Sequence, residues 1–169
     1  MNRAILILLL LSASVFAAAP WPGVDYAEVR AFAWDPAKTP PTEELVRKDF
    51  SLVDGVINKD GVVLTAVQVQ RLLRAQAHRF TDRPVAGCYT PHNAFVFYNA
   101  RKRPVAFLEV CFDCLGSRTQ PHDKDADPDF VALAAICAEL KLPFGKQPTV
   151  EAFRKENAWI LAPETSKPK

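Results

Sequence analysis

Three of the four cysteines and one of the three histidines fall between positions 88 and 114 of this chain. Cys88 and His92 form a C-x-x-x-H pair, and Cys111 and Cys114 form a C-x-x-C pair. Zinc is commonly held by two such short pairs, and copper also accepts thiolate and imidazole ligands. These four residues are therefore a candidate site for zinc or copper.

The sequence between the two pairs predicts a β-hairpin that would bring them together. Two apolar and aromatic runs, 94–98 and 105–112, suit a pleated sheet, and the polar sequence NARKRP between them is typical of a turn. In such a hairpin the paired residue numbers sum to about 200, give or take a few residues for the turn type. This register places His92 near Cys111 and brings Cys88 toward the C-x-x-C pair.

A disulfide is the simplest explanation of these cysteines, because proteins in oxidising compartments readily form disulfides. A bridge from Cys88 to Cys111 or Cys114 would tie the base of the hairpin and contribute about 3 kcal/mol in the chain-entropy model. Cys137, on the apolar face of a predicted helix, is a further disulfide candidate or a buried unreactive thiol. Four cysteines allow three full pairings, and the sequence does not select one.

Cys111 and Cys114 could also act as a redox pair that alternates between dithiol and disulfide. In the thioredoxin arrangement a C-x-x-C motif begins a helix, whose dipole lowers the pKa of the first thiol. Here the sequence LGSRTQP follows, which is not helical, and a straight strand would direct the two sulfurs to opposite faces. The redox interpretation therefore requires a tight turn at Phe112 and Asp113.

Two other chemical interpretations have less support. A nucleophile pair of Cys88 and His92 lacks both an identifiable orienting carboxylate and an oxyanion site. The D-x-D-x-D-x-D pattern over 123–129 suggests calcium, but an EF-hand loop needs Gly and Glu where Pro128 and Ala134 stand. We expect an acidic loop that leads into a helix cap.

The N-terminus has the pattern of a secretory signal peptide. Arg3 precedes an unbroken apolar run over 4–11, and small residues follow it. We expect cleavage after Ala17 and export to the periplasm or the exterior. The apolar run is too short for a membrane span, and no other segment approaches about 20 apolar residues, so no span is expected after cleavage.

The remaining residues, 18–169, are enough for a single domain, with a frayed C-terminal tail. Helical spacing of apolar residues predicts two main helices, at about 66–78 and 128–141. They would pack against an antiparallel sheet that includes the central hairpin, at about 94–112. Helices mixed with antiparallel hairpins indicate an α+β fold.

Smaller elements complete the predicted fold. They are a strand over 28–34, a short helix over 42–48, a small hairpin that pairs 52–57 with 62–64, a polar loop over 116–126 and a last helix from Thr149 to about 156. The formal net charge of +2 gives no reason to expect nucleic-acid binding.

The sequence thus predicts an exported α+β protein to which no reaction, substrate or partner can be assigned. Its first functional interpretation is a binding or interaction module stapled by disulfides. The alternatives are a zinc- or copper-binding protein, and a thiol–disulfide oxidoreductase that uses Cys111 and Cys114.

Overall fold

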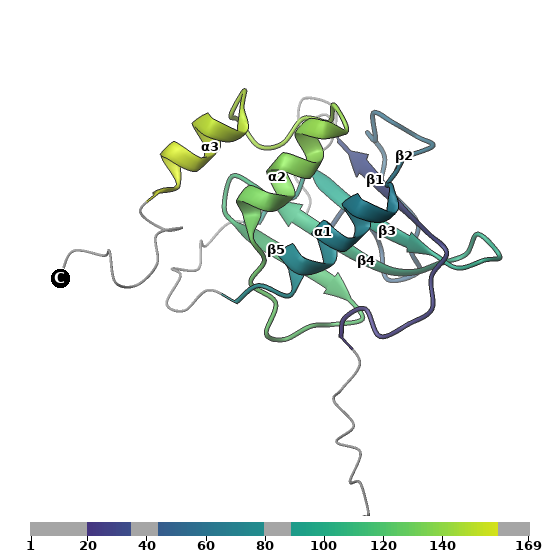
Figure 1. Ribbon diagram of the computed structural model, residues 1–169. Helices are drawn as coiled ribbons and strands as arrows, with labels where there is room; N and C mark the ends of the chain where they lie inside the picture. The colour runs from purple at the N-terminus through teal and green to yellow at the C-terminus, as the bar shows by residue number, and fades with distance from the viewer. Residues whose placement is uncertain (1–19, 35–43, 80–88, 159–169) are drawn as a thin grey trace, which may run out of the picture.

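The computed structural model describes residues 20–34, 44–79 and 89–158, and it forms a single α+β domain (Figure 1). Five antiparallel strands form one sheet in the order β2-β1-β3-β4-β5. The strands are β1 (Glu28–Ala33), β2 (Val62–Val63), β3 (Asn93–Tyr98), β4 (Pro104–Cys111) and β5 (Gly116–Gln120). The helices are α1 (Ala66–Gln76), α2 (Phe130–Glu139) and α3 (Val150–Glu156). The predicted fold class is confirmed.

The central hairpin is formed by β3 and β4. Val96 pairs with Phe107, which is within a few residues of the expected register. The turn is closed by Asn99, whose side-chain oxygen accepts hydrogen bonds from the backbone N–H groups of Arg101 and Arg103. The side chain of Asn99 thus accepts hydrogen bonds from backbone N–H groups that would otherwise have no partner in the turn.

The three helices begin at polar caps that the sequence largely reveals. Thr65 and Gln68 form the predicted capping box of α1, and Thr149 caps α3 as expected. Helix α2 begins later than predicted, because Asp129 is its cap instead of the residue before Pro128. The carboxylate of Asp129 accepts a hydrogen bond from a backbone N–H in the first turn.

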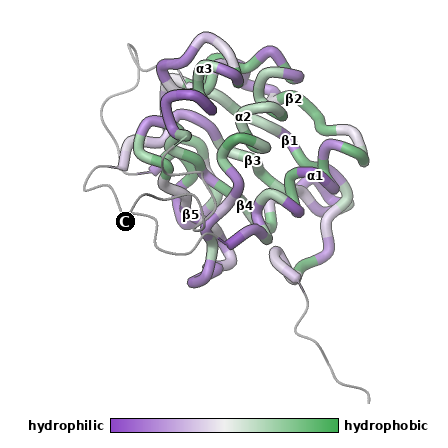
Figure 2. Tube along the Cα trace, turned by 60° about the vertical axis from the view of Figure 1, so that its left-hand side comes forward, coloured by the Kyte–Doolittle hydropathy of each residue, from purple (hydrophilic) through white to green (hydrophobic). Residues whose placement is uncertain are grey.

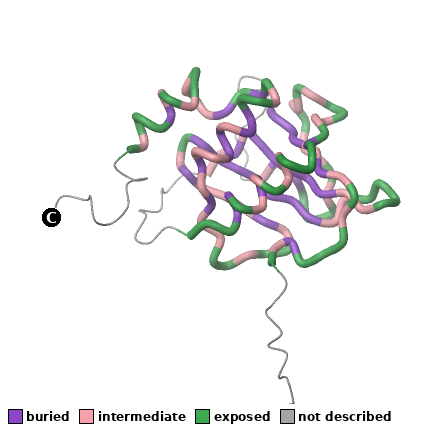
Figure 3. Tube along the Cα trace, in the orientation of Figure 1, coloured by how far each residue is buried: buried purple, intermediate pink, exposed green. Residues whose placement is uncertain are grey.

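Both faces of the sheet are covered, so the middle strands are buried almost throughout (Figure 3). Figure 2 shows hydrophobic residues along α2 and the inner strands. One core cluster lies between the sheet and the helices and includes Phe95, Phe97 and Leu133. A second cluster lies on the other face of the sheet and includes the buried side chains of Phe32, Trp34 and Phe107.

Two small predicted elements are wrong. The described part of the predicted helix over 42–48 is an irregular segment, in which Val46 bridges to Leu52. Residues 52–57 do not pair with 62–64, because β2 pairs with β1 instead. The backbone N–H groups of Leu45 and Val46 donate to the buried carboxylate of Glu109. They therefore do not serve as the free N–H groups of a first helical turn.

The predicted polar loop over 116–126 is also wrong in its first half. The chain turns sharply after β4 and returns as β5, which pairs with β4 along its length. An edge strand has only one neighbour and tolerates the polar residues that suggested a loop.

No helix in the described part of the chain is long and apolar enough to cross a membrane.

Several predictions concern segments outside the described residues. The signal peptide and its cleavage site fall within 1–19, and the predicted C-terminal tail within 159–169. Cys88 also lies outside the described residues.

Candidate functional site

The C-x-x-C motif forms the turn that joins β4 to β5. Strand β4 ends at Cys111 and β5 begins at Gly116, and Leu115 between them has a φ of 50°. This left-handed conformation lets the chain reverse within a few residues. The side chains of Cys111 and Cys114 meet in a hydrogen bond. The tight turn that the redox interpretation requires is therefore present.

Backbone N–H groups surround the two sulfurs. The N–H of Thr90 donates to both of them. The N–H of Cys114 donates to the sulfur of Cys111, and the N–H of Gly116 donates to the sulfur of Cys114. Hydrogen bonds of this kind favour a thiolate over a thiol, because they place partial positive charge against the anion.

The two thiols share a proton, which separates their acidities. The hydrogen bond from Cys114 lowers the pKa of Cys111 to about 6, although burial opposes this change. The same hydrogen bond raises the pKa of Cys114, since loss of the second proton would set two negative charges side by side. The pair thus favours loss of its first proton and opposes loss of the second. Cys111 is 1% exposed and Cys114 is half-buried, so Cys114 is the more accessible sulfur.

The ring of Tyr89 lies against Gly116, beside the sulfur of Cys114, and no local sequence pattern predicts this contact. A Cβ atom added to Gly116 would lie 2.8 Å from Cδ2 of Tyr89 and 3.3 Å from the sulfur of Cys114. The glycine therefore makes room for both side chains. The hydroxyl of Tyr89 is buried without a hydrogen-bond partner among the described residues, and burial is the main cause of its raised pKa.

A buried ion pair fixes the strands that carry the turn. Glu109 has no exposed surface and lies opposite Arg118 in the β4–β5 ladder, 2.9 Å from its Nη2. The same carboxylate accepts hydrogen bonds from the backbone N–H groups of Leu45 and Val46. The guanidinium of Arg118 also lies 5.0 Å from the ring centre of Phe107. A glutamate within the apolar run VAFLEVC was the sequence signal for this pair.

The backbone of His92 is hydrogen-bonded to β4, but the charged groups that affect the pKa of its imidazole are not the cysteines. Its backbone N–H donates to the carbonyl of Val110 at 3.3 Å, which agrees with the predicted register. Burial lowers the pKa of the imidazole, and the charges that act on it are those of Asp113 and Lys146. Among the residues that the structure describes, no group of three or more Cys, His, Asp or Glu residues could bind a metal. The four-ligand set stays a prediction, because it includes Cys88.

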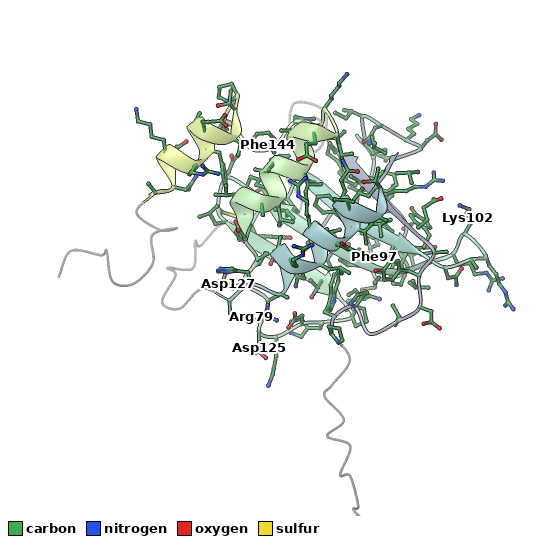
Figure 4. The ribbon with its side chains drawn as sticks, in the orientation of Figure 1. Arg79, Phe97, Lys102, Asp125, Asp127 and Phe144 are labelled. Atoms are coloured by element: carbon green, nitrogen blue, oxygen red, sulfur yellow. The ribbon has the colours of Figure 1, made fainter. Side chains whose placement is uncertain are left out.

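Cys137 and the acidic loop, the remaining candidates from the sequence, lie in surroundings that indicate a structural role. Cys137 lies fully buried on α2, where burial raises its pKa to about 12, and a thiol of this kind is unreactive. In the acidic loop, Asp123 is 3.0 Å from the guanidinium of Arg79, which neutralises its charge. Figure 4 labels Arg79 with Asp125 and Asp127 of the same loop.

Comparisons with known proteins add no family to this description. No protein-family model, no curated protein and no solved structure matches the chain. Cys111, Cys114 and Cys137 are free thiols in this structure.

Proposed function

We propose that Cys111 and Cys114 form a reversible dithiol–disulfide pair that exchanges disulfides with other proteins in an export compartment. One observation carries the proposal: a tight turn between β4 and β5 brings the two sulfurs into hydrogen-bond contact. Two sulfurs in hydrogen-bond contact can form a disulfide with a small movement of their side chains. The predicted signal peptide supports the compartment.

The exchange begins at Cys114, the more accessible sulfur. As it attacks one sulfur of a substrate disulfide, its proton passes to the thiolate of Cys111. A bond forms between Cys114 and that sulfur, the substrate S–S bond breaks, and the second substrate sulfur leaves as a thiolate. The buried Cys111 thus acts first as a base toward its neighbour.

The second step releases the substrate. Cys111 gives its proton to the departed thiolate and attacks the sulfur of Cys114, which forms the Cys111–Cys114 disulfide. The remaining substrate sulfur leaves as a thiolate. The pair loses two electrons and the substrate disulfide gains two. The same steps in reverse oxidise a substrate dithiol and reduce the pair.

Several features of the site support this chemistry. The lowered pKa of Cys111 favours a thiolate beside Cys114, and this thiolate accepts the proton of the attacking sulfur. The N–H groups of Thr90, Cys114 and Gly116 stabilise the thiolate of the reduced pair, which is the form that begins the exchange.

A second candidate function is the binding of zinc or copper by the same two thiolates. The N–H groups directed at the sulfurs favour this function too, because they stabilise metal-bound thiolates in the same way. It requires further ligands, for which Cys88 and His92 are the sequence candidates. A permanently oxidised staple in a binding module is a third outcome that the same experiment distinguishes.

The test uses the reduced protein and a short peptide that contains one disulfide. We expect the wild-type protein to reduce the peptide, and Cys114→Ser to abolish the reaction. Cys111→Ser should accumulate a mixed disulfide between Cys114 and the peptide, visible by mass spectrometry. Cys137→Ala is the matched control and should react as the wild type does, because its thiol is buried.

Three outcomes would overturn the proposal. The first is a wild-type rate no faster than that of the Cys111→Ser, Cys114→Ser double variant. The second is a stoichiometric metal ion that protects both thiols in the protein purified from the export compartment. The third is a disulfide at Cys111 or Cys114 that resists reduction in the native state, which would indicate the staple.

A further inference from the structure

A small cavity of about 100 Å³ lies directly against the C-x-x-C turn. Its walls include the two residues between the cysteines, Phe112 and Asp113. The other side is formed by Lys146, from the segment that joins α2 to α3, and by Phe153 and Glu156 of α3. The cavity thus adjoins the C-x-x-C turn, although neither cysteine lines it.

The segment between α2 and α3 is packed tightly onto the turn. Gly145 has a φ of +52°, and a Cβ atom at this position would lie 3.0 Å from both Oδ1 of Asp113 and Cβ of Phe112. The backbone N–H of Lys146 donates to Oδ1 of Asp113 at 3.0 Å. A side chain here would be strained and would press on the turn, so glycine favours the close packing of the cavity wall on the C-x-x-C turn.

The base of the cavity is aromatic and well packed. Phe112 makes edge-to-face contacts with Phe144 and Phe153, at centroid distances of 5.8 and 5.7 Å. Phe112 and Phe153 are 2% and 1% exposed. Figure 4 labels Phe144 near the end of α2. Rings that contact each other in this way leave a fixed apolar surface under a polar rim.

The rim carries two carboxylates and one ammonium group. Asp113 and Glu156 are exposed, and the side chain of Lys146 is 83% exposed, with its Nζ 3.9 Å from Oδ2 of Asp113. A long exposed lysine side chain can move away from this weak pair at little cost. The cavity therefore has a mostly polar lining with a small apolar patch at its base and a net acidic rim, which fits a side chain that ends in a cation.

We propose that this cavity binds a lysine or arginine side chain of a protein substrate, close to the cysteine that Cys114 attacks. The inference rests on the proposed thiol–disulfide exchange. Asp113 adjoins Cys114 in the chain, so their Cα atoms are about 3.8 Å apart. An extended peptide advances about 3.3 Å per residue, so a residue a few positions from the substrate cysteine can reach a cavity that Asp113 lines. The site thus selects substrates by a basic residue beside their disulfide.

The test uses short peptides whose one cysteine is joined to thionitrobenzoate, with Arg, Ser or Glu two residues away from that cysteine. We expect the reduced protein to react with the Arg peptide about three- to fivefold faster than with the Glu peptide, the scale of one partly exposed ion pair. Glu156→Lys should remove or invert this preference. Glu151→Lys, at the other end of α3 and outside the cavity lining, should retain it.

A small reagent separates this inference from the proposed function. Dithiodipyridine is uncharged at neutral pH and has no peptide side chain, so its reaction with the pair should be equal in the wild type and both variants. Equal rates for all three peptides, with normal reaction of the reagent, would overturn the cavity assignment and leave the exchange function intact. Failure of the reagent to oxidise the pair would overturn the exchange function itself.

Discussion

Glu109 and Arg118 face each other across the β4–β5 ladder, and the carboxylate of Glu109 is completely buried while it binds the guanidinium. The two strands that hold this pair are also the two that enter and leave the C-x-x-C turn. A buried carboxylate with four N–H donors connects the turn to the segment that covers the second face of the sheet. The ion pair thus helps to set the position of the cysteines.

Replacement of Glu109 by glutamine should destabilise the fold by about 3 kcal/mol, because it leaves a guanidinium in a partly buried site without its anion. Urea denaturation measures the free energy of unfolding. Glu139→Gln is the matched control, since Glu139 pairs with Arg71 on the surface and should contribute less than about 1 kcal/mol. Equal losses in the two variants would contradict the structural role of Glu109.

Replacement of Gly116 by alanine should displace Tyr89 and the sulfur of Cys114, because the new Cβ would lie 2.8 Å from the ring and 3.3 Å from the sulfur. We expect a loss of about 1–3 kcal/mol in the free energy of unfolding, as for an overpacked core. The exchange rate should also change. The neighbouring Ser117→Ala is the control, and a variant at Gly116 with wild-type stability and rate would contradict the described packing.

The acidity of the pair can be measured from the ultraviolet absorbance of the thiolate as the pH is raised. In the reduced protein, one thiolate should form with a midpoint near pH 6, whereas an ordinary thiol titrates at about 8.5. In Cys114→Ala the midpoint should rise, because the hydrogen bond that lowers the pKa of Cys111 is lost. Cys137→Ala should leave the titration unchanged, and an unchanged midpoint in Cys114→Ala would contradict the shared proton.

The same lowered pKa predicts how stability depends on pH. The pKa of Cys111 is lower in the folded protein than in the unfolded chain, so the thiolate stabilises the fold. This contribution is complete above the ordinary thiol pKa and is lost as the pH falls through about 6. The free energy of unfolding of the reduced wild type should therefore decrease over this interval more than that of Cys114→Ala.

The parts of the fold that follow local rules were predictable from the sequence. Val and Phe residues on both sides of a polar turn specified the central hairpin, and its register placed His92 beside the last residues of β4. Thr65 with Gln68 marked the start of α1. These signals depend on residues that are close in sequence, and tertiary contacts did not override them.

The missed parts depend on contacts between distant residues. Leu45 and Val46 give their N–H groups to Glu109, which no local pattern could reveal. Strand β5 contains mainly polar residues because it lies at the edge of the sheet. For the site, the spacing of Cys111 and Cys114 identified the pair, but the ring of Tyr89 over Gly116 depends on packing alone.

The most direct test of the proposed function is a redox titration of the full protein in glutathione buffers, with trapped thiols mapped by mass spectrometry. A reversible two-electron transition should convert free Cys111 and Cys114 into a disulfide between them, with the same midpoint in Cys137→Ala. The account would be contradicted if no disulfide joined these two residues at any potential. It would also be contradicted if either residue were bonded irreversibly to Cys88.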